Sequence, residues 1–255
     1  MFTKEKKSNE SLKWDKKSQN YPRYNPNSQE FQNKLWDVLE EKNIFNQNSL
    51  VLDIGCGTGV YTLPLAKKVK KVYGMDISEK MLNILLEDAR THSIDNIIAI
   101  HSNWQELDLK EKMFDVVFAS KTPALREYQD YEKMMEHSKK HLVYLGWAGV
   151  KESNIKQKLR ELYSLEFKKF DDTSKLKQWL KEKEISYHSI LFNDILSRPL
   201  SIENGVDQIK EYLTQANEHI TLSEDEILSI LKSLMKNEKL IYELQVRLEL
   251  ILWEK

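Results

Sequence analysis

Four residues at alternate positions, Asp53, Gly55, Gly57 and Gly59, stand in the stretch VLDIGCGTGVYTLPLA, which begins at Val51. Glycine lets the backbone turn tightly and approach a ligand without interference from a Cβ atom. The apolar run before the turn predicts a buried strand, and the segment after it predicts a helix whose first N–H groups are free to bind a ligand. The first strand-to-helix turn of a doubly wound sheet is the usual place for a nucleotide. The pattern therefore predicts a nucleotide-binding turn.

The residues around this turn discriminate among three classes of nucleotide site. A Walker loop ends in Gly-Lys-Ser/Thr, but no lysine follows this turn until Lys67. A dinucleotide fingerprint needs a glycine three places after its second glycine, and counting from Gly57 that position is Val60. Asp53, just before the turn, would repel a pyrophosphate but could pair with an ammonium group. The turn therefore disfavours a ligand that is held by its phosphates.

The segments that must position this turn alternate between short apolar runs and helical patterns. The strand candidates are SLVLDIG, KVYGMD, IIAIHS, FDVVFAS and HLVYLGW, and the helical segments between them include SEKMLNILLEDARTH and LREYQDYEKMMEHSKK. Ser78 is the expected N-cap of the first of these helices. Strands that alternate with helices favour a parallel sheet covered on both faces. The expected fold class is therefore α/β, with a doubly wound sheet.

The end of the chain carries a different pattern. In LIYELQVRLELILW, apolar residues alternate with polar ones over seven repeats, which predicts a half-exposed strand, antiparallel or at an edge. A helix-rich stretch at about 201–238 precedes it, with Ser223 and Glu226 spaced as a capping box. We expect one domain over residues 28–255 with a helical insertion at about 201–238. Residues 1–27, which are polar and contain two prolines, are expected to be a flexible leader.

The glycine turn resembles the first motif of the class I S-adenosylmethionine-dependent methyltransferases. The resemblance continues downstream, since Asp76 ends the second strand in VYGMDIS and occupies the family's ribose-binding position, and the apolar Ile77 follows on the adenine face. Asn103, in HSNWQEL, stands where the family often has an acid that accepts from the adenine amino group; an Asn carbonyl also accepts. FDVVFAS matches the fourth motif, with Ser120 at the mouth of the site.

This resemblance implies a Rossmann-like, mostly parallel seven-stranded sheet with an antiparallel last strand, and an enzyme that transfers a methyl group from S-adenosylmethionine. The cofactor-binding residues it implies, with two from the leader, are Asp53, Gly55, Cys56, Gly57, Gly59, Asp76, Ile77, Asn103, Trp104, Ser120, Tyr21 and Arg23. One alternative is a non-catalytic protein that binds this cofactor or a partner. A nicotinamide-dependent oxidoreductase is a further alternative, which Val60 and Asp53 disfavour.

A small molecule is the expected methyl acceptor. Amino-methylating DNA enzymes carry an Asn/Asp-Pro-Pro-aromatic run after the fourth strand, where this chain has SKTPAL, and cytosine C5 enzymes need a nucleophilic cysteine there. The net charge of −1 and the absence of a basic stripe argue against nucleic acid. Alignment does most of the work in methyl transfer, so no single catalytic residue is assigned.

The leader is a candidate lid over the cofactor, in which Arg23 could pair with a carboxylate. Lys121 could bind an anionic acceptor or be a solvated loop lysine. The candidate acceptor-binding residues are Trp14, Tyr24, Lys121, Thr122, Trp147, Phe192, Asn193 and Arg198.

Several features exclude other classes of protein. A single cysteine, Cys56, permits neither an intramolecular disulfide nor a cysteine-based zinc site. His137 and His141 lie four apart in a helical pattern, but no third ligand is evident, so no metal site is predicted. Trp36 and Trp179 lie on amphipathic faces and are expected in the core. No run of 18 apolar residues and no signal peptide is present, so a cytoplasmic protein is expected. Association into a homodimer is a further possibility.

Overall fold

The structure is a computed structural model that describes residues 9–27, 30–109, 111–167, 169–216 and 220–255. The chain divides into two compact units. The first comprises Met1–Gly146, Ser174–Ile190 and Leu250–Lys255, and the second comprises Trp147–Thr173 and Leu191–Glu249. Residues 1–8 of the expected leader and 217–219 of the expected insertion lie outside the described residues.

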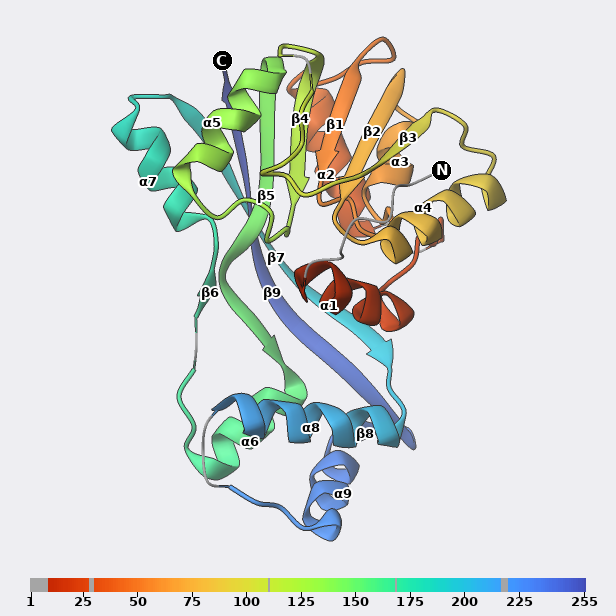
Figure 1. Cartoon of the computed structure of the whole chain (residues 1–255). Helices are drawn as coiled ribbons and strands as arrows, with labels where there is room; N and C mark the ends of the chain where they lie inside the picture. Colours follow the sequence, from red (N-terminus) through yellow and green to blue (C-terminus); the bar gives the residue numbers. More distant parts are fainter. Residues whose placement is uncertain (1–8, 28–29, 110, 168, 217–219) are drawn as a thin grey trace. The chain divides into compact units, whose positions relative to one another are not determined.

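The strands form a sheet in the order β3-β2-β1-β4-β5-β9-β7, with β6 paired to β5 and β8 paired to β9 off this path (Figure 1). These strands are β1 (Leu50–Ile54), β2 (Lys71–Asp76), β3 (Ile97–His101), β4 (Phe114–Ser120), β5 (Ser138–Ser153), β6 (Phe170–Asp171), β7 (Tyr187–Pro199), β8 (Met235–Lys236) and β9 (Lys239–Glu254). The adjacent strands β3, β2, β1, β4 and β5 pair in parallel. Strand β9 is antiparallel to the strands on either side of it (Figure 1). The predicted α/β fold, with a mostly parallel sheet and an antiparallel last strand, is confirmed.

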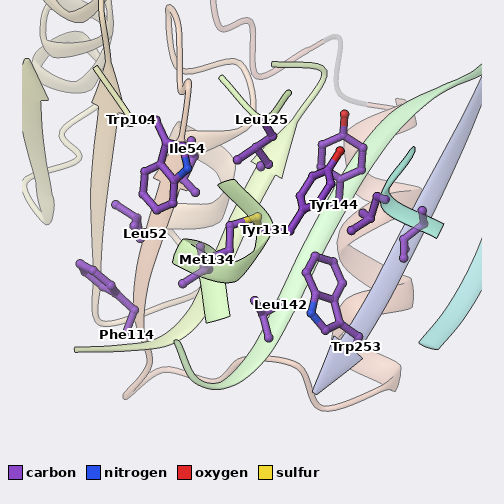
Figure 2. Packing of buried hydrophobic residues seen from close by; sticks show 14 of the residues in the cluster. Leu52, Ile54, Trp104, Phe114, Leu125, Tyr131, Met134, Leu142, Tyr144 and Trp253 are labelled. Carbon is purple, nitrogen blue, oxygen red and sulfur yellow. The ribbon is translucent and has the colours of Figure 1, made fainter. Parts of the chain in front are cut away.

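Helices cover both faces of the sheet in the first unit. They are α2 (Glu30–Glu41), α3 (Thr62–Ala66), α4 (Glu79–Thr91), α5 (Tyr128–His137) and α7 (Ser174–Glu182). Side chains of β1, β4 and β5 pack with α5 and α7 in one cluster, which includes Leu52, Tyr131 and Trp179 (Figure 2). On the other face, Trp36 of α2 packs against Phe118 of β4 with ring centroids 5.7 Å apart. Both tryptophans expected in the core are buried there.

The leader contains a helix that its sequence does not reveal. Helix α1 (Asn9–Lys17) and a short 3-10 turn (Ser18–Asn20) replace the expected flexible segment. The buried face of this part of the chain is polar, because it consists of Ser11, Asp15 and Ser18. Hydrophobic periodicity is the main sequence signal for a helix, and here it is absent from the face that packs.

The second unit has a core of its own. Its helices are α6 (Asn154–Tyr163), α8 (Ile202–Ala216) and α9 (Glu224–Ser233), which bury a cluster that includes Leu159, Ile209 and Leu231. The capping box at the start of α9 is present, since Ser223 and Glu226 bond to each other's backbone N–H groups. The described part of the expected insertion belongs to this unit, which also takes in residues 147–173, 191–200 and 239–249. Among the described residues, no helix is long and apolar enough to cross a membrane.

Candidate functional site

The glycine turn after β1 is built by close packing. Gly55 has a φ of +69°, and a Cβ atom there would lie 2.0 Å from the Thr122 hydroxyl oxygen. Gly59 has a φ of +85°, and its Cβ would lie 2.2 Å from a methyl carbon of Leu85 in α4. No side chain fits at either distance, and a positive φ is strained for other residues. These two glycines therefore let the turn pass between β4 and α4.

A cavity of about 540 Å3 opens at the carboxyl ends of β1, β2 and β4. The strand order reverses between β1 and β4, which is the usual ligand site of a doubly wound sheet. Its volume is within the range of roughly 300–1,000 Å3 that is common for small-molecule sites. Of the residues expected to bind the cofactor or acceptor, those that line it are Trp14, Tyr21, Gly55, Gly57, Asp76, Ile77, Asn103, Trp104, Ser120, Lys121 and Thr122.

Asp76 lies at the end of β2 with both carboxylate oxygens already positioned. One oxygen accepts from the Gly57 N–H at 2.9 Å and the other from the Ser78 N–H at 2.8 Å. Burial raises the pKa of Asp76 above its ordinary value, although these two backbone hydrogen bonds lower it in part. A carboxylate has about four acceptor sites, so two remain after these contacts. Asp76 can thus accept further hydrogen bonds from a ligand in the cavity.

Asp53 lies beneath the turn and does not line the cavity. Its Oδ2 accepts from the Thr62 hydroxyl at 2.7 Å, while its Oδ1 is buried with no hydrogen-bond partner among the described residues. Burial raises the pKa of Asp53 to about 7, with the hydrogen bond from Thr62 opposing this and the charge of Asp76 adding to it. The carboxyl beneath the turn therefore gains or loses its proton near neutral pH.

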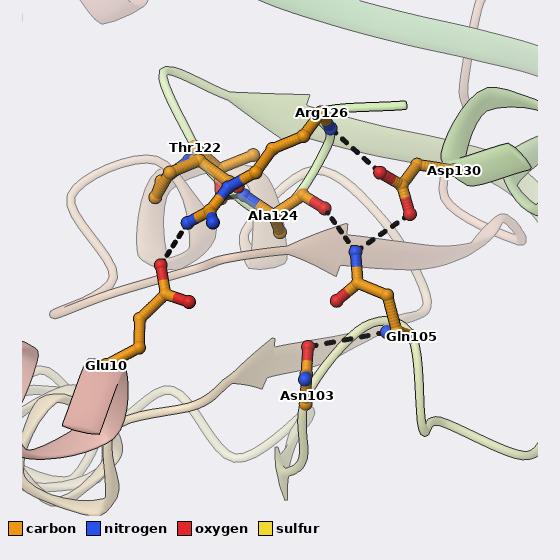
Figure 3. A network of polar contacts seen from close by, with 8 residues as sticks. Glu10, Asn103, Gln105, Thr122, Ala124, Arg126 and Asp130 are labelled. Atoms are coloured by element: carbon orange, nitrogen blue, oxygen red, sulfur yellow. Dashed lines mark hydrogen bonds and ion pairs between the residues drawn. The ribbon is translucent and has the colours of Figure 1, made fainter. Parts of the chain in front are cut away.

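A polar network forms the opposite wall of the cavity (Figure 3). The Gln105 side chain donates to the Asp130 carboxylate at 2.8 Å and to the Ala124 carbonyl at 3.0 Å. The second Asp130 oxygen accepts from the Arg126 N–H at 2.8 Å. Asn103 accepts from the Gln105 N–H at 3.4 Å, a long contact that leaves its side chain available to a ligand. The network fixes the loop that follows β4 to the loop that follows β3.

Helix α1 is attached to both of these walls. The Ser11 hydroxyl donates to the Ile77 carbonyl at 3.0 Å, and Asp15 accepts from the Ser78 hydroxyl at 2.7 Å. Ser78 also caps α4, as predicted, by accepting from the Met81 N–H. On the other wall, Arg126 pairs with Glu10. The helix therefore links the loop after β2 to the loop after β4, and Glu10 and Trp14 line the cavity.

Other predicted residues lie outside the cavity lining. Arg23 pairs with Asp88 and Glu87 of α4. Tyr24 is buried and accepts from Lys67 at 3.0 Å. Cys56 is buried, and its burial raises the pKa of the thiol well above the ordinary value. The remaining predicted residues outside this lining are Asp53, Gly59, Trp147, Phe192, Asn193 and Arg198, of which the last four belong to the second unit.

The two histidines that invited a metal interpretation do not share a helix. His137 is the last residue of α5, whereas His141 lies in β5, so their expected helical spacing is wrong. The helix ends there because the next residue, Ser138, is extended. Among the described residues there is no group of three or more His, Cys, Asp or Glu side chains that could hold a metal ion.

Sequence reasoning missed several residues of the cavity wall. Glu10, Gln105, Arg126 and Gln129 all line it. Gln105 lies two places after Asn103 in the segment HSNWQEL, so the resemblance pointed to its neighbourhood. Arg126 and Glu10 are 116 positions apart and carry no motif. Their pairing could not be found without the fold.

Residues 51–146 match the family described as a methyltransferase domain. Over 103 residues the chain is 32% identical to the demethylmenaquinone methyltransferase of Geobacillus stearothermophilus, and the match covers 39% of this chain and 43% of that protein. The chain spans less than half the length of the first curated relatives that it matches.

Two solved structures extend the likeness to most of the chain. The YcgJ protein from Bacillus subtilis has a TM-score of 0.56 at 16% identity, over 86% of this chain and 97% of that one. A phosphoethanolamine N-methyltransferase from Haemonchus contortus, in complex with phosphomonomethylethanolamine and S-adenosylhomocysteine, has a TM-score of 0.50 at 15% identity, over 88% of this chain and 52% of that one. At these identities the likeness establishes a common fold.

Proposed function

We propose that the chain, whose residues 51–146 match a methyltransferase domain, is a class I S-adenosylmethionine-dependent methyltransferase and transfers a methyl group from S-adenosylmethionine to a small-molecule acceptor. The observation that carries the proposal is the cavity at the end of β1, β2 and β4. Residues from four separate motifs converge on it, represented by Gly57, Asp76, Asn103 and Ser120.

The residues of this cavity fit such a cofactor. Asp76 offers acceptors for the two ribose hydroxyls, and Ile77 offers an apolar surface beside them. Asn103 also lines the cavity, and its side-chain amide can accept from, or donate to, an adenine edge. No described residue gives the buried Asp53 Oδ1 a hydrogen bond, so a positively charged ligand group above the turn would favour the ionised form of this carboxyl. When bound, S-adenosylmethionine supplies an electrophilic methyl group on a positively charged sulfur.

The chain's own contribution to the transfer is alignment and exclusion of water. Helix α1 contributes Glu10 and Trp14 to the cavity lining. Tyr21, which directly follows the 3-10 turn, lines it as well. A site closed in this way favours a reaction in which charge is dispersed as the methyl leaves. Rigid walls, such as the Gln105–Asp130 network, hold two reactants in line. We assign no general base, because an acceptor that arrives deprotonated does not require one.

A small-molecule acceptor is supported by the size and closure of the cavity. The same space must hold both reactants, and α1 spans from the loop after β2 to the loop after β4. The net charge of −1 offers no bulk attraction to nucleic acid. The expected homodimer and the cytoplasmic location stay predictions.

Calorimetric titration with S-adenosylhomocysteine tests the cofactor assignment. Wild-type protein should bind it, and Asp76→Ala should abolish binding because the ribose acceptors are lost. Gly57→Val should do the same, because valine is strained at a φ of +56° and its branches would enter the cavity beside Tyr21. Asp37→Ala, which alters an exposed carboxylate on α2, is the matched control. Tight binding of NADH with no response to either adenosyl ligand contradicts the proposal.

A screen of candidate acceptors with methyl-labelled cofactor distinguishes the enzyme from a non-catalytic binding protein. Transfer of label to any small acceptor, lost in Asp76→Ala, supports the enzyme. Binding of cofactor with no transfer across chemically varied amines, phenols, thiols and carboxylates supports the binding protein.

A further inference from the structure

We propose that strand β7 associates with a second copy of this chain. The two β7 strands pair antiparallel about a two-fold axis that passes through Leu191. This inference goes beyond the proposed function and does not depend on it. It rests on the exposure of the strand and on the match of its sequence to itself in one register.

Strand β7 (Tyr187–Pro199) lies at one end of the strand order, so no described strand lies beside its outer edge. None of its thirteen residues is buried. Three large apolar side chains, spaced four residues apart and so on one face of the strand, are exposed to 38%, 56% and 57% for Tyr187, Leu191 and Ile195. An edge strand of this kind offers its backbone to another chain.

The outer edge of β7 carries few of the features that keep edge strands apart. Such strands are commonly short or carry lysine or proline. The whole chain contains 39 lysines and arginines, yet residues 187–197 contain none, and Arg198 and Pro199 come only at the end of the strand. Pairing about a two-fold axis uses the same edge of both copies and closes on itself. A second copy therefore occupies this edge without leaving a place for further chains.

The exposed face of β7 matches itself when the axis passes through Leu191. In an antiparallel pair of identical strands, opposed residues are equally far from the axis and point to the same face. Leu191 then faces its own copy, and Tyr187 faces Ile195. The polar Ser189 faces the polar Asn193. Aromatic and branched apolar pairs of this kind stabilise a sheet.

The other face of the strand matches in the same register. Ile190 faces Phe192, and His188 faces Asp194. A histidine ring can donate a hydrogen bond in either protonation state, and a carboxylate has about four acceptor sites. The Asp194 carboxylate already accepts from the Ile195 N–H of its own chain at 2.8 Å, which leaves capacity for His188 of the second copy. The acid of the strand thus meets a donor.

Neighbouring registers do not give this match. Moving the axis to Phe192 places Leu191 opposite Asn193. It also places Ile190 opposite Asp194. With the axis at Asn193, apolar residues meet again, but Asp194 then faces Phe192. The axis at Leu191 is therefore the position at which apolar residues meet apolar ones and the acid meets a donor.

Sedimentation velocity of the full chain over a range of concentrations tests the association. Wild type should form a dimer that dissociates on dilution. Leu191→Lys places two ammonium groups against each other at the axis and should weaken the dimer about 100-fold. Leu162→Lys, at a leucine of α6 that is 50% exposed, is the matched control and should leave the dimer unchanged. A wild type that is monomeric throughout overturns the proposal, as does a dimer that Leu191→Lys leaves intact or that Leu162→Lys removes.

A charge exchange tests the register. His188→Asp places a carboxylate opposite Asp194 and should weaken the dimer several-fold, because like charges directly opposite destabilise a sheet. Adding Asp194→Lys to this variant restores an opposite-charge pair and should restore the affinity. A double variant that is no tighter than His188→Asp contradicts the register.

Oxidative cross-linking gives a second, independent measure of the register. The opposed α-carbons at position 191 lie roughly 4.5–5.5 Å apart in such a pair, a distance that a disulfide spans, so Leu191→Cys should form a covalent dimer. Ile195→Cys is equally exposed, but its copy lies eight residues away along the strand, roughly 27 Å, and it should not cross-link. The native Cys56 is buried.

No cross-link in Leu191→Cys, or equal cross-linking of both cysteine variants, overturns the proposed pairing. None of these measurements involves the cofactor. A failure of the association therefore leaves the proposed methyltransferase function untouched, and a failure to bind S-adenosylhomocysteine leaves the association untouched.

Discussion

Replacing Asp53 by asparagine should make the protein more stable at neutral and alkaline pH. The Asp53 carboxyl is fully buried, one of its oxygens has no hydrogen-bond partner among the described residues, and burial raises its pKa to about 7. Asparagine has nearly the same size and keeps a carbonyl that can accept from Thr62. It cannot ionise, so the cost of burying a charge disappears.

The size and pH window of the effect follow from proton linkage. The unfolded carboxyl ionises near its ordinary pKa of 3.8, whereas the folded one holds its proton up to about pH 7. Between these values the folded state binds more protons, so wild-type stability falls as pH rises. The full difference is about 4 kcal/mol, at about 1.4 kcal/mol per pH unit. The stabilisation of the folded wild type by the protonated Asp53 carboxyl is fully present below pH 4 and is lost as the pH rises through 7.

Urea unfolding at pH 5 and pH 8 measures this difference. The advantage of Asp53→Asn over wild type should grow by about 2–3 kcal/mol between these pH values. Hydrogen exchange at the β1 amides assigns the change to the first unit. Asp37→Asn, on the exposed face of α2, should show no such growth. An advantage that does not change with pH would refute the reasoning, as would a carbon-13 titration that places the Asp53 carboxyl near its ordinary pKa.

Two further predictions concern the packing of the turn and of α1. Gly59→Ala should destabilise the protein by about 1–3 kcal/mol, because its Cβ would lie 2.2 Å from Leu85. Gly149→Ala should cost less, because among the described residues only its chain neighbours come within 4 Å of its Cβ. Thermal unfolding compares the two variants, and equal costs would contradict the packing argument. Asp15→Ala should speed hydrogen exchange in α1 and the release of S-adenosylhomocysteine, because it removes the acceptor of the Ser78 hydroxyl. Lys16→Ala, at an exposed position of α1, should change neither the hydrogen exchange of α1 nor the release rate of S-adenosylhomocysteine. If hydrogen exchange in α1 stays as slow in Asp15→Ala as in Lys16→Ala, Asp15 does not hold the helix.

The sequence predicted the parts of the fold in which local pattern and burial agree. The strand β1 is buried along nearly its whole length, as its continuous apolar run indicates. Ser78 caps α4, and the alternation in the last strand marks β9. The glycine turn and Asp76 line up at the end of adjacent strands because strands in a parallel sheet place their carboxyl ends together. These features depend on neighbours in the chain, which a sequence displays.

The division into two units could not be predicted in the same way. At three of its four crossings the boundary between the units falls inside a long strand (β5, β7 and β9), and at the fourth it falls between Thr173 and Ser174, where α7 begins. No Pro-rich or Gly-rich segment marks it. Trp147 is the first residue beyond such a boundary, and the apolar run that contains it does not reveal to which core it belongs.

The closure of the site depends on contacts that no local pattern encodes. Helix α1 is held through Asp15 to Ser78, and the same Ser78 donates its N–H to Asp76. Asp15 and Asp76 are thus two carboxylates on either side of one serine, and the charge of Asp15 adds to the raised pKa of Asp76. Movement of α1 away from Ser78 would remove a negative charge from beside Asp76 and free the residue that fixes its oxygen. The position of the leader and the acceptor strength of Asp76 are therefore coupled through a single side chain, which is why a motif can identify Asp76 but cannot show what controls it.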